Sequence, residues 1–89
     1  MRKAKVDANQ AEIVKALRKV GCSVQSLATL GKGAPDLLVG YQGCNFLMEV
    51  KGEKGLLRAV QAAWRSNWSG HVHTVRSTED ALKVIWAVE

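Results

Sequence analysis

The stretch of sequence that decides the fold covers residues 33–51 and reads GAPDLLVGYQGCNFLMEVK. Two runs of aliphatic, aromatic and β-branched residues lie on either side of Gln42-Gly43, which is the composition of two strands joined by a tight turn. Gly is favoured at the second position of a two-residue hairpin loop, although Gln is a weaker first residue than Asn or Asp. We therefore predict a β-hairpin in which Tyr41 faces Cys44.

The predicted turn fixes how the two strands pair. Counting outward from it pairs Gly40 with Asn45, Leu38 with Leu47, and Asp36 with Glu49. Because successive side chains of a strand alternate between faces, Lys51 shares the face of Glu49. The opposite face receives Phe46, Met48 and Val50. The hairpin is therefore expected to have one apolar and one charged face near its open end.

The Asp36 and Glu49 carboxylates are directly opposed in this register. Like charges opposite each other, with Cβ atoms about 5 Å apart, destabilise a sheet. The candidates for neutralising them are a hard divalent cation, which prefers carboxylate oxygens, and the nearby Lys51 ammonium. Each residue alone has an ordinary explanation, because an Asp after Pro is a common turn residue and Glu-Val-Lys is a common edge-strand pattern. Their convergence on one patch favours a functional site.

These residues resemble a known family. Pro35-Asp36 followed by Glu49-Val50-Lys51 on the next strand is similar to the PD-(D/E)xK nuclease signature. The runs GAPDLLVG, MEVKG and the downstream QAAW at 61–64 are closest to the small, virus-type VRR-Nuc branch, and the resemblance covers nearly the whole chain. It implies an α/β fold with a restriction-endonuclease-like αβββαβ core and an extra C-terminal helix.

The resemblance also implies an activity, that of a Mg²⁺- or Mn²⁺-dependent endonuclease that cleaves DNA phosphodiesters. By this resemblance, Asp36, Glu49 and the Val50 carbonyl hold the metal. Glu12 of the first helix contributes directly or through water, although a helical Glu at the border of an apolar stripe is usually only solvated. The rival hypothesis is a non-catalytic nucleic-acid-binding module that keeps the fold and the charge.

Two further residues receive roles from the resemblance. Lys51 is expected to orient the attacking water and to stabilise charge on the phosphorane. Gln61 is expected to position Lys51 or the water. A Gln in an apolar stripe needs partners for its carbonyl and its amide, or it costs about 1 to 3 kcal/mol. The alternative is a Gln at the edge of the stripe that reaches solvent.

Composition indicates the class of protein and of partner. The 89 residues correspond to one small domain, residues 1–89, with a limited core. Thirteen Lys and Arg against eight Asp and Glu give a formal charge of +5, which favours polyanionic partners without requiring one. Cys22 and Cys44 match neither a disulfide framework nor the paired spacing of a zinc site. With no signal peptide and no membrane-spanning run, we expect a soluble, cytoplasmic protein, and the virus-type resemblance allows a phage gene in a bacterial host.

The N-terminal part of the chain predicts a basic arm, a helix and a strand. Residues 1–6 are expected to be frayed. Asp7 is a good N-cap and Gly21 a natural C′ residue, so a helix is predicted over about 8–20. Its buried stripe contains Ile13, Val14, Leu17 and Val20. A first strand is predicted over about 23–29.

The C-terminal part predicts a helix, a strand and a last helix. The first of these begins after the turn at 52–55 and runs to about Ser69, with a stripe of Leu57, Gln61, Trp64 and Trp68. We expect both Trp residues in the core or an interface rather than as base-stacking platforms. A short strand covers 71–76. Ser77 and Asp80 resemble a capping box that starts a helix over roughly 78–88.

Surface residues predict the partners. Lys32, Lys54 and Arg58 are candidate phosphate contacts or simply solvated charges. His71 and His73 share a face and could suit a transition metal, although surface or phosphate-facing histidines are the favoured interpretation. The apolar arc of the last helix is wider than one core stripe needs, which predicts a twofold homodimer. Paired sites suit paired cuts, so branched DNA, above all four-way junctions, is the expected substrate. The arc contains Ala81, Leu82, Val84, Ile85, Trp86 and Val88.

Overall fold

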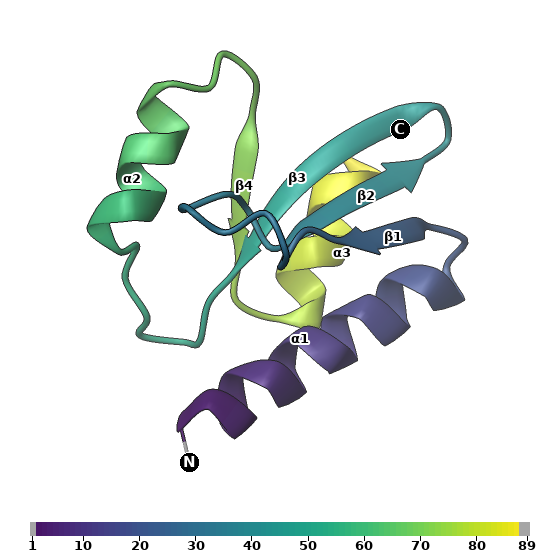
Figure 1. The fold of residues 1–89 in the computed structure, drawn as a ribbon. Helices are drawn as coiled ribbons and strands as arrows, with labels where there is room; N and C mark the ends of the chain where they lie inside the picture. Colours follow the sequence, from purple (N-terminus) through teal and green to yellow (C-terminus); the bar gives the residue numbers. More distant parts are fainter. Residues whose placement is uncertain (1, 88–89) are drawn as a thin grey trace.

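The structure is a computed structural model that describes residues 2–87, with side chains from Ala8 onward. Its element order is α-β-β-β-α-β-α, as predicted (Figure 1). The elements are α1 (Arg2–Lys19), β1 (Ser23–Ser26), β2 (Leu37–Tyr41), β3 (Cys44–Val50), α2 (Ala59–Ser66), β4 (Val72–Val75) and α3 (Thr78–Trp86). Within these described residues, no helix is long and apolar enough to cross a membrane.

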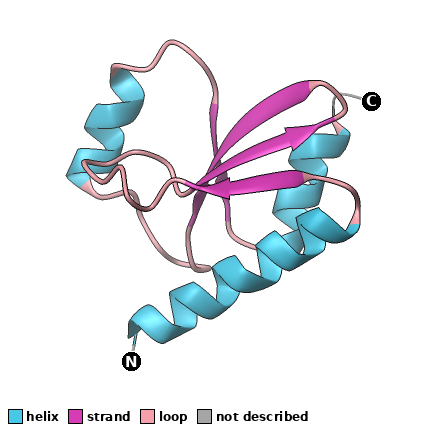
Figure 2. Cartoon of the chain, turned by 45° about the vertical axis from the view of Figure 1, so that its right-hand side comes forward, coloured by secondary structure: helices cyan, strands magenta, loops and turns pink. Residues whose placement is uncertain are grey.

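The four strands form one sheet in the order β1-β2-β3-β4. The first two pairings are antiparallel, and β3 pairs with β4 in parallel. A parallel pair needs a crossover connection, and α2 lies in that connection. Figure 2 shows α1 and α3 together on one side of the sheet and α2 by itself on the other. The two faces of the sheet are therefore covered very differently.

The hairpin between β2 and β3 has the predicted register. Tyr41 pairs with Cys44, and the ladder continues through Gly40 with Asn45 and Leu38 with Leu47 to Leu37 with Met48. Gln42 and Gly43 have φ angles of 48° and 81°, so both central residues of the turn are left-handed. This geometry matches the twist of the strands, and it explains why Gly occupies the second position.

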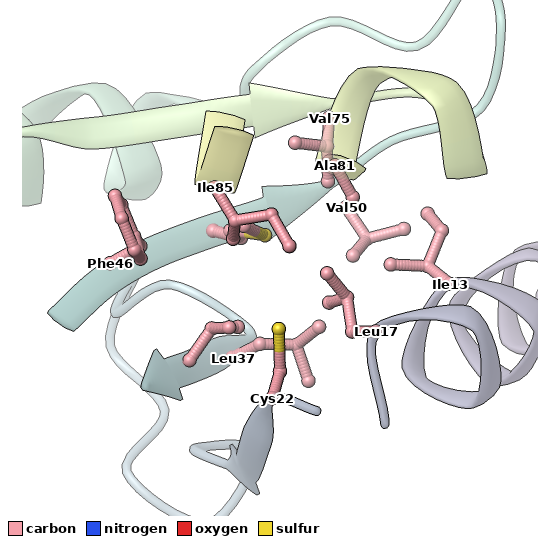
Figure 3. Close-up of a cluster of buried hydrophobic side chains, with 11 residues drawn as sticks. Ile13, Leu17, Cys22, Leu37, Phe46, Val50, Val75, Ala81 and Ile85 are labelled. Atoms are coloured by element: carbon pink, nitrogen blue, oxygen red, sulfur yellow. The ribbon is translucent and has the colours of Figure 1, made fainter. Parts of the chain in front are cut away.

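The hydrophobic core lies between the sheet and the pair α1 and α3 (Figure 3). Phe46, Met48 and Val50 point into it, which confirms the predicted apolar face of the hairpin. The helices contribute Ile13, Leu17, Ala81 and Ile85, all fully buried.

Helix α1 ends as predicted but begins earlier. The helix extends back to Arg2, so the frayed arm over residues 2–6 and the N-cap at Asp7 are wrong. Arg, Lys and Ala in this segment are good helix formers, which explains the extension. At the other end, Gly21 has a φ of 102°, and the Cys22 N–H donates to the Leu17 carbonyl (3.0 Å) in a Schellman arrangement. Val20 lies beyond the helix and is exposed, unlike the rest of the predicted stripe.

The other predicted boundaries differ by a few residues. Strand β1 ends at Ser26, because the Leu27 N–H donates to the Asp36 carbonyl and the chain then turns. Helix α2 is shorter than predicted, because it begins only at Ala59 and ends at Ser66. At its end the Ser66 hydroxyl donates to the carbonyls of Ala62 and Ala63. Helix α3 begins after Ser77, whose side chain accepts the Asp80 N–H (3.1 Å), as predicted.

The apolar arc of α3 is mostly covered by the domain itself. Ala81 and Ile85 are fully buried, and Leu82 and Val84 pack against the core. Trp86 stays 45% exposed. Val88 lies outside the described residues. The part of the arc left for an interface is therefore smaller than the sequence pattern indicates.

Candidate active site

Two carboxyl groups and an ammonium group meet on the α2 side of the sheet. Asp36 directly precedes β2, and Glu49 is the penultimate residue of β3. The Lys51 Nζ lies 3.9 Å from the Glu49 Oε2. The carboxyl groups of Asp36 and Glu49 are hydrogen-bonded to each other. The structure thus brings together the three charged residues that the hairpin register places on one patch.

Asp36 is fixed by the backbone of the neighbouring strand. Its Oδ2 accepts the Val50 N–H at 2.7 Å. The Lys51 N–H donates to the Val75 carbonyl on the opposite edge of β3, toward β4. The N–H and C=O of one strand residue point to the same edge, so the Val50 carbonyl also lies on the Asp36 side. The site therefore offers a backbone oxygen beside the two carboxyl groups.

Glu49 is 3% exposed, and its surroundings disfavour its charged form. Burial is the main cause, followed by the hydrogen bond to Asp36 and the charge of Asp36, and together they raise the pKa of Glu49 to about 8. The positive charges of Lys51 and Arg65 act in the opposite direction but do not compensate. The carboxyl pair therefore keeps a proton at neutral pH unless another cation takes its place.

Gln61 is 6% exposed and has partners at both ends of its amide. Its Nε2 donates to the Glu49 Oε2 at 2.9 Å, and its Oε1 accepts the Arg58 N–H at 2.8 Å. The predicted partner was Lys51 or a water molecule, and the structure places the amide on Glu49 instead. The second contact caps the first turn of α2. One side chain thus starts the helix and joins it to the site.

A search of solved structures found a chain described as a VRR_NUC domain. It is 26% identical in sequence, the TM-score is 0.76, and the match covers 96% of this chain and 98% of that one. This fold is that of a VRR-Nuc domain. No protein-family model matches the sequence, and a search of the curated proteins found no match either. The resemblance seen in the hairpin motifs is confirmed by the structure, and the protein has a nuclease-type fold.

Glu12 lies on an exposed part of α1. Among the described side chains, residues 8–87, no three His, Cys, Asp or Glu side chains form a group that could hold a metal. The role of Glu12 at the carboxyl pair therefore stays a prediction from the resemblance. Helix α1 reaches the site through Asn9, whose Nδ2 donates to the Lys51 carbonyl at 3.2 Å. Nothing in the sequence pattern of α1 marks Asn9 for this contact.

The donor set nevertheless fits a hard divalent cation. It consists of two carboxyl groups, one of them buried and short of positive charge, and the Val50 carbonyl on the same side. Mg²⁺ is commonly held by one or two carboxylates and completes its shell with water and substrate oxygens. The histidines are a different case. The rings of His71 and His73 stack with a centroid distance of 5.0 Å, and His73 contacts Phe46 on the core side of the sheet.

Arg65 is a member of the site that sequence reasoning missed. It follows Gln61 by one helical turn, so both lie on the same side of α2. Its Nη2 donates to the Thr74 hydroxyl at 2.7 Å, and Thr74 is the β4 partner of Glu49. Spacing from Gln61 could have identified it. The predicted phosphate contacts at Lys32, Lys54 and Arg58 are all exposed, as such a role requires.

Arg76 holds the segment that follows Lys51. Its Nη1 donates to the carbonyls of Gly52 (2.7 Å) and Gly55 (2.6 Å), and more weakly to that of Glu53 (3.4 Å). Asn9 also donates to the Arg76 carbonyl (3.4 Å). A flexible glycine turn is therefore fastened directly beside the site, by a residue 21 or more positions further along the chain.

Proposed function

We propose that the protein is a Mg²⁺- or Mn²⁺-dependent endodeoxyribonuclease that hydrolyses DNA phosphodiesters. One observation carries the proposal: Asp36, Glu49, Lys51 and Gln61 converge at the end of one hairpin in a nuclease-type fold. A net charge of +5 supports a polyanionic substrate.

The chain's own residues divide the work in this proposal. Asp36, Glu49 and the Val50 carbonyl hold the cation. The cation, when bound, supplies Lewis acidity toward the phosphate and lowers the pKa of a water molecule. Gln61 keeps the Glu49 carboxyl oriented through its 2.9 Å hydrogen bond. Glu12 of α1 contributes directly or through water in this proposal.

Lys51 provides the charge that the reaction needs. Hydrolysis joins the water oxygen to phosphorus and breaks one P–O ester bond, and negative charge develops on the phosphoryl oxygens. The Lys51 ammonium, at the edge of the carboxyl pair, orients the water and stabilises this charge. Arg65 adds a second positive charge on the same side of the sheet. Neither role requires a rearrangement of the strands.

The finer proposal concerns the substrate and the assembly. We propose a homodimer that cuts branched DNA, with four-way junctions as the preferred form. Trp86 supports an interface, because it is exposed on α3, whereas Ala81 and Ile85 of the same helix are buried in the core. A twofold dimer places two single-cut sites on symmetry-related sides, which suits paired incisions.

The test is a cleavage assay with purified protein on supercoiled plasmid, linear duplex and a four-way junction, each with Mg²⁺, Mn²⁺ or EDTA. We expect cleavage with either metal, none with EDTA, and faster cutting of the junction. Lys51→Ala should abolish cleavage, and Lys83→Ala, at an exposed Lys of α3 on the opposite side of the sheet, is the matched control. DNA binding without cleavage under every condition would instead support a non-catalytic binding module. Light scattering after size exclusion tests the dimer separately.

A further inference from the structure

Two tryptophans form a stacked pair at the end of α2, outside the core. The rings of Trp64 and Trp68 have centroids 4.8 Å apart and an interplanar angle of 23°. Neither belongs to the buried core, and Trp68 is 48% exposed. The expectation was that both residues lie in the core or an interface; the core is excluded, and the interface stays a prediction. A large aromatic surface is left open on the side of the sheet that carries the candidate active site.

We propose that the Trp64 and Trp68 pair is a stacking site for an unpaired nucleobase of the DNA substrate. The inference rests on the proposed function and specifies which part of a branched substrate this face recognises. Stacking on an aromatic side chain suits unpaired bases of any sequence, because every base has a π-face. Bases in an intact duplex do not offer that face.

The position of the pair supports this assignment. Trp64 follows Gln61 by three residues on α2, which is about 5 Å along the helix axis. Gln61 in turn contacts Glu49 in the carboxyl pair. The pair therefore lies within about two helical turns, along the chain, of the residue that contacts the carboxyl pair.

The surroundings of the pair have the chemistry of a nucleotide site. A hollow of about 430 Å³ is lined by Lys32, Val60, Ala63, Trp64, Asn67 and Trp68. Ring faces and small apolar side chains suit a base, and the Lys32 ammonium suits the attached phosphate. This positive charge favours DNA over a second copy of the chain, which would meet an ammonium group in an otherwise apolar interface.

The loop that carries Lys32 is built to lie against α2. Lys32 and Gly33 have φ angles of 55° and 87°, so the chain turns sharply there. Gly33 packs so closely on the Val60 carbonyl that a Cβ at this position has no room. Figure 1 shows the loop between β1 and β2 beside α2. Glycine at position 33 therefore places Lys32 next to the aromatic pair.

Trp68 also lines a second hollow, of about 660 Å³, whose lining comes from both faces of the sheet. Leu38, Asn45 and Leu47 share the face of Glu49, whereas Phe46 and His73 lie on the core side. This hollow adds apolar surface next to the exposed ring of Trp68.

The test measures DNA binding by fluorescence anisotropy in EDTA, on the Lys51→Ala background, so that it does not depend on cleavage. The probes are oligothymidylate, a four-way junction with unpaired bases at its centre, and a blunt duplex. Trp68→Leu should lower affinity for oligothymidylate about tenfold or more, in line with the loss of one stacked base. It should leave blunt-duplex affinity unchanged. Trp68→Phe keeps a ring and should retain most of the affinity.

Two controls make the test specific. Leu56→Ala removes another exposed apolar side chain near α2 and should change no affinity. In a Trp86→Phe protein the stacking pair contains the only tryptophans, and oligothymidylate should quench their emission. Equal affinities of Trp68→Leu and its parent for oligothymidylate would overturn the proposal. So would an equal loss on all three probes together with conversion of a dimer to a monomer, because a second copy would then cover the pair. Absence of cleavage by the wild-type protein would refute the proposed nuclease activity, and the binding comparison would still decide whether the tryptophan pair stacks on a base.

Discussion

The two faces of the central hairpin are made by alternate residues of the same two strands, yet one face forms the core and the other carries the candidate active site. On one face, Met48 and Val50 are buried under two helices and hold the domain together. On the other, Glu49 is equally buried but polar, and its enclosure depends on Gln61 and one short helix that makes few other contacts. Because side chains alternate strictly, stability and chemistry are separable one residue apart. The separation can be tested from both sides.

The largest expected effect comes from removing a carboxyl group. Asp36→Ala or Glu49→Ala should abolish Mn²⁺ binding, measured by calorimetric titration, and cleavage with it. Asp36→Ala also removes the acceptor of the Val50 N–H, and Glu49→Ala removes the acceptor of the buried Gln61 amide, so each metal-free variant should melt at a lower temperature than the parent. Unchanged Mn²⁺ affinity in both variants would refute the site.

Met48→Ala is the matched change on the opposite face. It leaves a cavity in a fully buried position and should cost about 2 to 5 kcal/mol in free energy of unfolding. The Mn²⁺ affinity of the folded protein should stay the same, measured below the new melting temperature. A variant that folds normally and loses the metal would show that the two faces are coupled.

The second effect in size is a pH dependence of metal binding. The pKa of Glu49 is raised to about 8, so a cation must displace a proton below that pH. Affinity for Mn²⁺ should rise about tenfold per pH unit up to about pH 8 and level off above it. Titration calorimetry in buffers of different ionisation enthalpy measures the released proton directly.

The same shift predicts the stability of the metal-free protein. The native state holds the Glu49 proton up to about pH 8, whereas an unfolded chain releases it near the ordinary value of 4.5. The native state therefore binds more protons in this window, and the free energy of unfolding should fall as pH rises through it. Glu49→Gln should flatten this dependence, and Glu53→Gln on the exposed loop is the control. A parent protein with a flat profile would contradict the pKa.

A smaller effect is expected from the clamp behind Lys51. Arg76→Met removes the hydrogen bonds to the 52–55 turn and should reduce cleavage about tenfold, because misplaced groups in a catalytic site lose rate readily. Mn²⁺ affinity should change little, since both carboxyl groups precede the turn. Hydrogen exchange in 52–55 should increase. Lys83→Met, at an exposed position of α3, is the control. Unaltered exchange in Arg76→Met would argue against the clamp.

The sequence is informative where contacts are short-range and weaker where they are not. The register of Asp36 and Glu49 follows from a two-residue turn and strict alternation, so it could be predicted. The boundary of α2 could not, because Gln61 both accepts the Arg58 N–H three residues before it and donates to Glu49 on β3. The contact with Glu49 is tertiary and leaves no periodic trace in the sequence.

The same limit applies to the residues around the site. Asn9 contacts a carbonyl 42 positions away, and Arg76 reaches back 24 positions to Gly52. Glu12 was taken from the resemblance because a first-helix Glu fits the family pattern, and its role stays a prediction. Contacts between α1 and the hairpin are made only in three dimensions, so the sequence pattern of α1 does not identify them.

The smallest expected effect is on stability and comes from the Gln42-Gly43 turn, which fixes the register of β2 and β3 and so decides which residues lie on each face. Gln42 has a φ of 48°, a left-handed conformation that Asn adopts more readily, and Asn-Gly is the favoured pair for this turn. Gln42→Asn should therefore raise the free energy of unfolding by about 0.5 to 1 kcal/mol, measured by urea denaturation. Because the register stays the same, both faces keep their partners, and Mn²⁺ affinity should not change. Gln42→Val, whose branched side chain disfavours left-handed backbone, should destabilise the protein instead. If Gln42→Val were neutral, the turn would not control the register, and the placement of Asp36 opposite Glu49 would have to come from the helices.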